Sequence, residues 1–203
     1  MRVGLLGGTF NPPHVGHMIC AQEALDALGL DVVRLVVAAT PPHKDVPEDP
    51  GVGARVAMCR AAVAGVPGLE VSLVELERPG PSYTVDTLRA LHAAEPENEL
   101  TFVMGGDMAR SLPAWREPGA ILALARIAVA EREEVRRADV AERLAGLGAG
   151  ADRVGFFDMP RIDISSTAVR RRAAAGRSVR FLVPDAVARY IESHAPYGVG
   201  AVA

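Results

Sequence analysis

Two histidines three residues apart, His14 and His17, follow a glycine pair and a short apolar run at residues 3–6. If a helix begins near Pro13, both imidazoles lie on one face of it, because residues three apart are neighbours on a helix surface. They then also lie at a helix N-terminus, where unpaired N–H groups and the helix dipole favour bound anions. Two ring donors beside an anion site indicate phosphate chemistry.

A metal site is the main alternative for a histidine pair. The other histidines supply no third ligand at close spacing, and the chain has neither an HExxH motif nor a cysteine cluster, so we expect no metal held by protein ligands. The glycines Gly7 and Gly8 could serve only a tight turn. Neither the P-loop nor the GxGxxG pattern is present, so the usual phosphate loops of kinases and dehydrogenases are not supported.

Length and composition indicate one globular domain over residues 1–203, its last part a small helical extension. Hydrophobic residues make up 49% of the chain and charged residues 23%, which is typical of a folded protein. The net charge of −3 argues against a nucleic-acid partner. Because Met1 and Arg2 lead straight into the glycine motif and no apolar run reaches membrane length, we expect a cytoplasmic protein with no membrane partner.

Alternating strand and helix patterns predict an α/β fold. The apolar runs expected to be strands are 3–6, 32–38, 69–76, 100–104 and 127–130, and the helical patterns are 14–28, 54–66, 84–94 and 135–147. This order implies a Rossmann-like, doubly wound parallel sheet. A run at 154–157 is compatible with a last strand. Helices starting near Ser165 and Pro184 would form the carboxyl-terminal helical part, from about residue 160 to 203.

Ligands of such sheets bind where the carboxyl ends of the strands meet, so residues that directly follow strands are candidates. Gly105 and Asp107 follow one strand, and we expect Asp107 to reach this edge. The alternative interpretation of Asp107 is an N-cap of the next helix, and the two roles can coexist. Lys44 follows another strand in the irregular segment 41–53, although a solvated lysine is the simpler interpretation. We expect the segments 41–53 and 105–117 to be loops.

A second hydroxyl-rich segment, Ser165-Ser166-Thr167, precedes Arg170. Its hydroxyls can satisfy the first N–H groups of a helix, which alone would explain them. The same helix end could hold a polyphosphate, with Arg170 adding a forked guanidinium for phosphate oxygens.

Both segments resemble known motifs. Residues 7–17 are similar to the GGxFxPxHxGH signature of the nucleotidyltransferase superfamily, and residues 164–170 resemble its ISSTxxR element. Residues 82–88 resemble the SYTxDTL segment of bacterial nicotinate-nucleotide adenylyltransferases, and residues 105–108, 112–115 and 183–191 also resemble that family. The resemblance spans almost the whole chain.

The resemblance implies transfer of AMP from ATP to nicotinate mononucleotide, giving nicotinate adenine dinucleotide and pyrophosphate in NAD biosynthesis, with Mg²⁺ carried by the ATP phosphates. Both partners are small molecules, and assembly into a homo-oligomer is left open. The acceptor phosphate is already an anionic nucleophile, so positioning and charge stabilisation can carry the catalysis without a general base.

Carried over residue by residue, the resemblance implies that Asp107 binds ribose hydroxyls, Trp115 stacks on the pyridine ring and Thr84 contacts the pyridine carboxylate. The implied catalytic residues are His14, His17, Lys44 and Arg170. The implied ATP-binding residues are Gly7, Gly8, Thr9, Phe10, His17, Gly105, Asp107, Ile164, Ser165, Ser166, Thr167 and Arg170. The implied nicotinate-mononucleotide-binding residues are Asn11, His14, Lys44, Tyr83, Thr84, Trp115 and Arg116.

One position departs from the family pattern, because Arg116 stands where a second aromatic residue is common. Stacking on the acceptor ring would then rely on Trp115 alone, and a core tryptophan is its alternative interpretation.

A phosphopantetheine adenylyltransferase is the nearest rival enzyme, since it shares both outer motifs, but such proteins are usually shorter and lack the SYTVDTL segment. A non-catalytic nucleotide sensor is the rival from another class, and intact transition-state donors argue against it.

Overall fold

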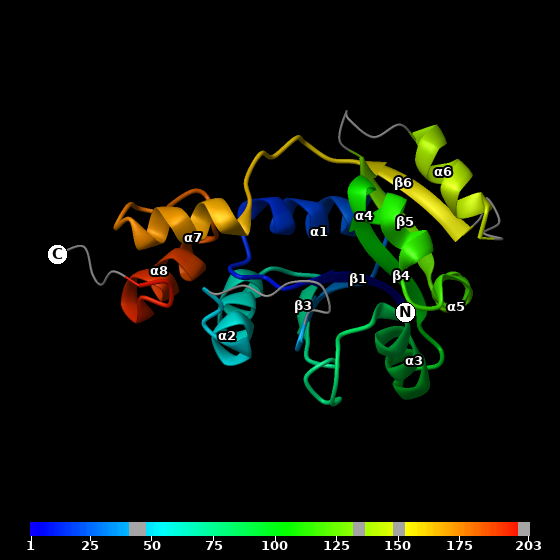
Figure 1. Ribbon diagram of the computed structural model, residues 1–203, viewed down its shortest axis with the longest axis horizontal. Helices are drawn as coiled ribbons and strands as arrows, with labels where there is room; N and C mark the ends of the chain where they lie inside the picture. The colour runs from blue at the N-terminus through cyan, green and yellow to red at the C-terminus, as the bar shows by residue number, and fades with distance from the viewer. Residues whose placement is uncertain (41–47, 132–136, 148–152, 199–203) are drawn as a thin grey trace.

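A six-stranded parallel sheet forms the centre of the protein in a computed structural model that describes residues 1–40, 48–131, 137–147 and 153–198 (Figure 1). The strand order is β3-β2-β1-β4-β5-β6, and every neighbouring pair is parallel. The order reverses between β1 and β4, which confirms the doubly wound sheet and places the switch point beside the first motif. The strands are β1 (Arg2–Gly8), β2 (Val32–Val37), β3 (Leu69–Ser72), β4 (Glu99–Gly105), β5 (Arg126–Glu131) and β6 (Val154–Asp158).

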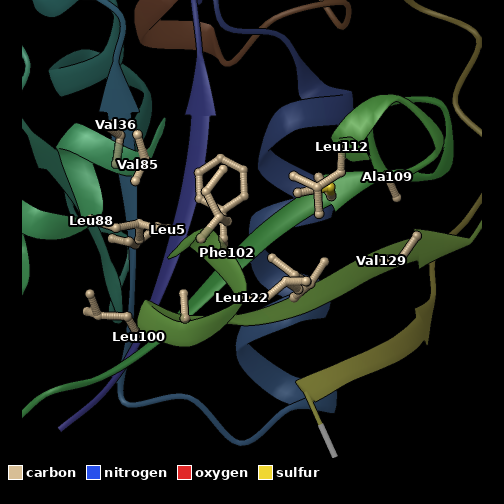
Figure 2. Close-up of a cluster of buried hydrophobic side chains, with 14 of the residues drawn as sticks. Leu5, Val36, Val85, Leu88, Leu100, Phe102, Ala109, Leu112, Leu122 and Val129 are labelled. Carbon is tan, nitrogen blue, oxygen red and sulfur yellow. The ribbon is translucent and has the colours of Figure 1, made fainter. Parts of the chain in front are cut away.

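Helices cover both faces of the sheet, because successive buried side chains of each strand point to opposite sides. On one face Phe102 of β4 packs with Leu5 of β1 and Leu88 of the helix that follows β3 (Figure 2). On the other face Leu35 and Val103 pack against the first two helices. The helices are α1 (Val15–Ala27), α2 (Val52–Val63), α3 (Thr84–Ala94), α4 (Gly106–Ser111), the 3₁₀ helix η1 (Leu112–Ala114), α5 (Pro118–Leu124), α6 (Arg137–Ala145), α7 (Ser166–Ala174) and α8 (Asp185–His194).

The carboxyl-terminal helices have a small apolar core of their own. Val169 of α7 and Val187 of α8 pack with Met58 and Ala62 of α2. Figure 1 shows the chain after β6 crossing to the far end of the molecule, so that α7 and α8 lie beside α1 and α2. This crossing brings the second motif back to the first.

Two sequence predictions were wrong in detail. The third strand ends at Ser72 instead of residue 76, because β3 is an edge strand that pairs only with β2, and its last partner there is Val36. The segment 105–117 contains α4 and η1 and leads into α5, whereas we expected a loop. Pro113 and Pro118 lie in first turns of η1 and α5, where a missing N–H costs nothing.

Candidate functional site

The turn between β1 and α1 brings the two histidines together as predicted. His14 is the N-cap of α1 and is buried, and its ring stacks on the ring of His17 with 3.7 Å between centroids. The backbone N–H of His14 donates to Nδ1 of His17 at 3.1 Å. Because Nδ1 accepts this bond, a neutral His17 carries its proton on Nε2, which is therefore a donor.

Glycines in this turn make room for rings. A Cβ on Gly16 would lie 3.1 Å from Nδ1 of His14, and a Cβ on Gly8 would lie 3.0 Å from the Phe10 ring. Phe10 in turn packs edge-on against His17, with 5.0 Å between ring centroids. Gly8 and Gly16 thus let the aromatic side chains of the first motif pack closely.

The two outer motifs are directly hydrogen bonded. Ser166 Oγ donates to the carbonyl of Pro12 at 2.9 Å, and Arg170 Nη1 donates to the carbonyl of Asn11 at 2.9 Å. Ser165 caps α7 as predicted, since its hydroxyl accepts from the N–H of Ala168. Arg170 is buried, and its Nε–H makes no hydrogen bond within the described residues. The N-terminus of α7 therefore lies against the histidine turn.

A cavity of about 760 Å³ lies at this edge of the sheet. It is lined by most of the predicted site residues: Gly7, Gly8, Thr9, Phe10, Asn11, His14, His17, Thr84, Gly105, Asp107, Trp115, Ile164, Ser165, Ser166, Thr167 and Arg170. Tyr83 and Arg116, which the structure also describes, do not line it. Lys44 lies outside the described residues. The structure thus gathers side chains from five separate segments around one space.

Asn11 is a buried polar side chain of the cavity wall whose amide group is unpaired within the described residues. It is 2% exposed, and neither its amide nitrogen nor its amide oxygen has a hydrogen-bond partner among the described residues. An unpaired buried amide is costly. A bound ligand could supply both a donor and an acceptor to it.

Trp115 and Thr84 line the cavity from the α3 side. Trp115 is partly buried, its indole packs edge-on against Phe102, and Nε1 donates to Ser111 Oγ at 3.0 Å. Thr84 is the first residue of α3, where the unpaired N–H groups of a helix N-terminus lie. An aromatic side chain and a helix N-terminus thus lie on the same side of the cavity.

Tyr83 and Arg116 lie behind this wall and contact each other. The Arg116 guanidinium lies 4.8 Å from the centre of the Tyr83 ring and 3.5 Å from the carboxylate of Asp86. Asp107 is exposed and bonds to Arg110 at 2.6 Å. Asp107 reaches the cavity as expected, and since the N-cap of α4 is Gly105, its alternative interpretation as a helix cap was wrong.

Sequence reasoning missed Arg55 and Arg110. Arg55 is 1% exposed, and it donates to the carbonyls of Thr9 and Ala38 at 3.0 and 2.7 Å. Nothing in the local pattern marked it, because its partners come from the ends of two strands. Arg110 lines the cavity, and its spacing from Asp107 on a helix could have revealed their ion pair.

Within the described parts of the chain, no group of three or more histidine, cysteine or acidic side chains could hold a metal ion. In the same parts of the chain, no helix is long and apolar enough to cross a membrane.

Comparison with known proteins places the chain in a family. The cytidylyltransferase-like family model matches residues 5–172. The chain is 44% identical to a probable nicotinate-nucleotide adenylyltransferase of Roseiflexus sp. over 96% of this chain and 97% of the relative. It is also 44% identical to one from Thermus thermophilus, over 97% of this chain and all of the relative.

The fold is similar to a solved structure of Plasmodium falciparum nicotinic acid mononucleotide adenylyltransferase complexed with NaAD. The TM-score is 0.78, the identity is 14%, and the match covers 97% of each chain. At that identity the likeness concerns the fold alone.

Proposed function

The chain belongs to the cytidylyltransferase-like family and to its nicotinate-nucleotide adenylyltransferases, and on that premise we propose that it transfers AMP from ATP to nicotinate mononucleotide. The products are nicotinate adenine dinucleotide and pyrophosphate, so the reaction is a step of NAD biosynthesis. One observation carries the proposal from the structure. Ser166 and Arg170 hydrogen bond to Pro12 and Asn11, and both motifs line one cavity.

In this reaction a phosphate oxygen of the acceptor attacks the α-phosphorus of ATP. A new P–O bond forms while the bond to the bridging oxygen of the leaving pyrophosphate breaks and its electron pair leaves with pyrophosphate. No base is needed, because the nucleophile is already ionised. Catalysis then depends on alignment and on donors aimed at the developing charge.

His17 is the best-oriented of these donors. Its Nδ1 accepts from the His14 N–H, which fixes Nε2 as the donating nitrogen, and we assign that nitrogen to a non-bridging oxygen of the α-phosphate. His14 would donate from the adjacent stacked ring, and the N-terminus of α7 would receive the other phosphates. Arg170, with an Nε–H that the described protein does not use, would add positive charge there. Lys44 keeps its predicted role in phosphate binding.

Mg²⁺ fits this site as a companion of the triphosphate. Of the carboxylates that line the cavity, Asp107 and Asp163 are each engaged by an arginine, at 2.6 and 3.1 Å, and Glu75 accepts from Thr87 Oγ1 at 2.6 Å. Phosphate oxygens would therefore be the main ligands of the ion. Bound there, the ion would neutralise negative charge on the phosphates.

The acceptor would lie between Trp115, Thr84 and Asn11. The indole of Trp115 offers a stacking face for the pyridine ring, and the first N–H groups of α3 suit its carboxylate. The unpaired amide of Asn11 would take part in acceptor binding from the β1 side. Asp107 lies in the first turn of α4, which follows β4, and there it could accept from ribose hydroxyls.

The substrate is tested by incubating the protein with ATP, Mg²⁺ and one acceptor at a time. We expect pyrophosphate release with nicotinate mononucleotide. Pyrophosphate release only with phosphopantetheine would assign the rival transferase activity. The absence of pyrophosphate release with every acceptor would favour a nucleotide sensor. Rates with the nicotinate and nicotinamide mononucleotides would measure the preference for the acid.

The role of His17 is tested with His17→Ala. Losing one donor to a developing charge lowers kcat by roughly a hundredfold or more, whereas ground-state binding of ATP changes little. Single-turnover rates and ATP titrations measure the two effects, and the exposed His92→Ala variant on α3 is the control. Near-normal turnover in His17→Ala would rule out this assignment.

A further inference from the structure

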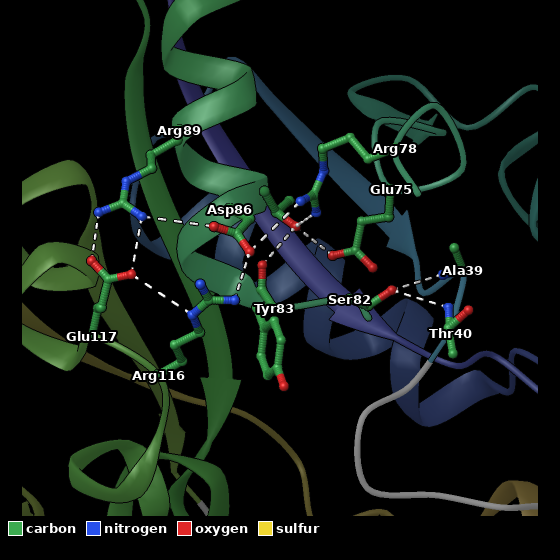
Figure 3. A network of polar contacts seen from close by, with 11 residues as sticks. Ala39, Thr40, Glu75, Arg78, Ser82, Tyr83, Asp86, Arg89, Arg116 and Glu117 are labelled. Atoms are coloured by element: carbon green, nitrogen blue, oxygen red, sulfur yellow. Dashed lines mark hydrogen bonds and ion pairs between the residues drawn. The ribbon is translucent and has the colours of Figure 1, made fainter. Parts of the chain in front are cut away.

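Four charged side chains, Asp86, Arg89, Arg116 and Glu117, form a closed ring of ion pairs (Figure 3). Arg89 and Arg116 each contact both Asp86 and Glu117. Arg89 lies 3.7 Å from the Asp86 carboxylate and 2.6 Å from that of Glu117. Arg116 lies 3.5 Å from Asp86 and 3.8 Å from Glu117. We call these four residues the ionic ring.

The ionic ring joins two segments that are distant in sequence. Asp86 and Arg89 belong to α3, two and five residues after Thr84, whereas Arg116 directly follows Trp115. Arg116 also covers the ring of Tyr83, the N-cap of α3. Thr84 and Trp115 both line the cavity, so the ring ties together the two residues that the proposed function gives to the acceptor.

The Trp115 segment needs such an external tie. Glu117 has φ 50° and ψ 58°, a left-handed conformation that is unfavourable for a residue other than glycine and that persists only when surrounding contacts impose it. Its carboxylate receives both Nη1 and Nη2 of Arg89, at 3.1 and 2.6 Å, and two parallel bonds of this kind fix direction as well as distance. The Arg89 guanidinium also holds the pKa of the Glu117 carboxyl below its ordinary value.

We propose that the ionic ring is a positioning device that sets the place of Trp115 relative to Thr84, and thereby the recognition of the pyridine nucleotide acceptor but not of ATP. The inference rests on the proposed function for the identity of the acceptor. None of the four side chains lines the cavity, so each acts through a neighbour that does. Most residues of the ATP side belong to other segments, around His17 and α7, and Gly105 and Asp107 lie ten and eight positions before Trp115.

The side chains of Arg89, Arg116 and Glu117 are 48%, 52% and 43% exposed, so solvent and salt screen their interactions. We therefore expect a moderate effect on acceptor binding, which salt weakens. Glu117→Gln should raise the KM for nicotinate mononucleotide by about two- to fivefold, corresponding to the upper range of an exposed ion pair. The KM for ATP should stay unchanged.

The experiment compares Glu117→Gln with Glu95→Gln. Glu95 at the other end of α3 accepts two bonds from Arg34 at 3.0 Å, so the control removes the same kind of ion pair far from the cavity. Trp115 is the only tryptophan, so acrylamide quenching of its fluorescence reports its position without any substrate. We expect faster quenching and a raised acceptor KM in Glu117→Gln, and neither in Glu95→Gln.

A double-mutant cycle with Arg89→Gln completes the test. If Arg89 and Glu117 act as one device, the double variant raises the acceptor KM about as much as either single variant. Unchanged quenching with unchanged KM in Glu117→Gln, or equal rises of KM for ATP and acceptor, would overturn the inference. Failure of the proposed function has a different signature, because the wild-type protein would then make no product from nicotinate mononucleotide, and the KM comparison would use whichever acceptor reacts.

Discussion

Replacing Arg55 by methionine should destabilise the protein strongly, because this arginine is the buried donor that joins the ends of β1 and β2. The guanidinium donates to the carbonyls of Thr9, Ala38 and Ala39, at 3.0, 2.7 and 3.3 Å. Methionine keeps much of the apolar stem but offers no donor. The three carbonyls then lose their partner at a buried position, since Arg55 is 1% exposed.

The size of the loss follows from these contacts. Each buried carbonyl left without its donor costs about 1–3 kcal/mol, so we expect a loss of about 3–5 kcal/mol for the three together. Asp49, the ion-pair partner at 3.2 Å, is 30% exposed and can return to water, which favours the lower end of this range. For a chain of this length, such a loss lowers Tm by roughly 6–20 °C.

Urea unfolding followed by circular dichroism measures the free energy, and thermal melts measure Tm. Arg60→Met is the matched control, because Arg60 is exposed on the same helix and its loss should change stability by less than about 0.5 kcal/mol. A loss below about 1 kcal/mol in Arg55→Met would refute the reasoning, since it would mean that water or a shifted backbone satisfies the freed carbonyls.

Two further predictions concern the histidine turn and the ionic ring. Gly16→Ala should lower kcat in steady-state assays with little loss of stability, because its Cβ would lie 3.1 Å from Nδ1 of His14 and push that ring aside. Unchanged turnover would show that the His14 ring can move without consequence for catalysis. The Arg89 hydrogen bond lowers the pKa of Glu117 below its ordinary value of 4.5. That contribution is therefore complete above pH 4.5 and is lost as the pH falls through the lowered pKa. On acidification below pH 4.5 the wild-type protein should lose more stability than Glu117→Gln, and parallel stability curves in urea unfolding would contradict this.

The sequence alone predicted the sheet and the edge at which the site lies. Alternating apolar runs and helical patterns specify βα units, and right-handed crossovers place the carboxyl ends of all parallel strands at one edge. Residues in the turns between strands and the next helices, and at the starts of those helices, must then gather there, and His14 and Asp107 both line the cavity. The capping role of Ser165 was equally predictable, because a cap is a local interaction between neighbours in the chain.

Only the tertiary structure decided which polar side chains face the cavity and which support its wall. Tyr83 and Arg116 belong to segments that otherwise supply the cavity lining, yet Arg116 turns to Asp86, 30 positions away in the chain. Arg55 bonds to carbonyls 46 and 17 positions away. Local periodicity cannot reveal such contacts, because the partner of a long charged side chain is set by which distant backbone and carboxylate groups the fold brings within its reach.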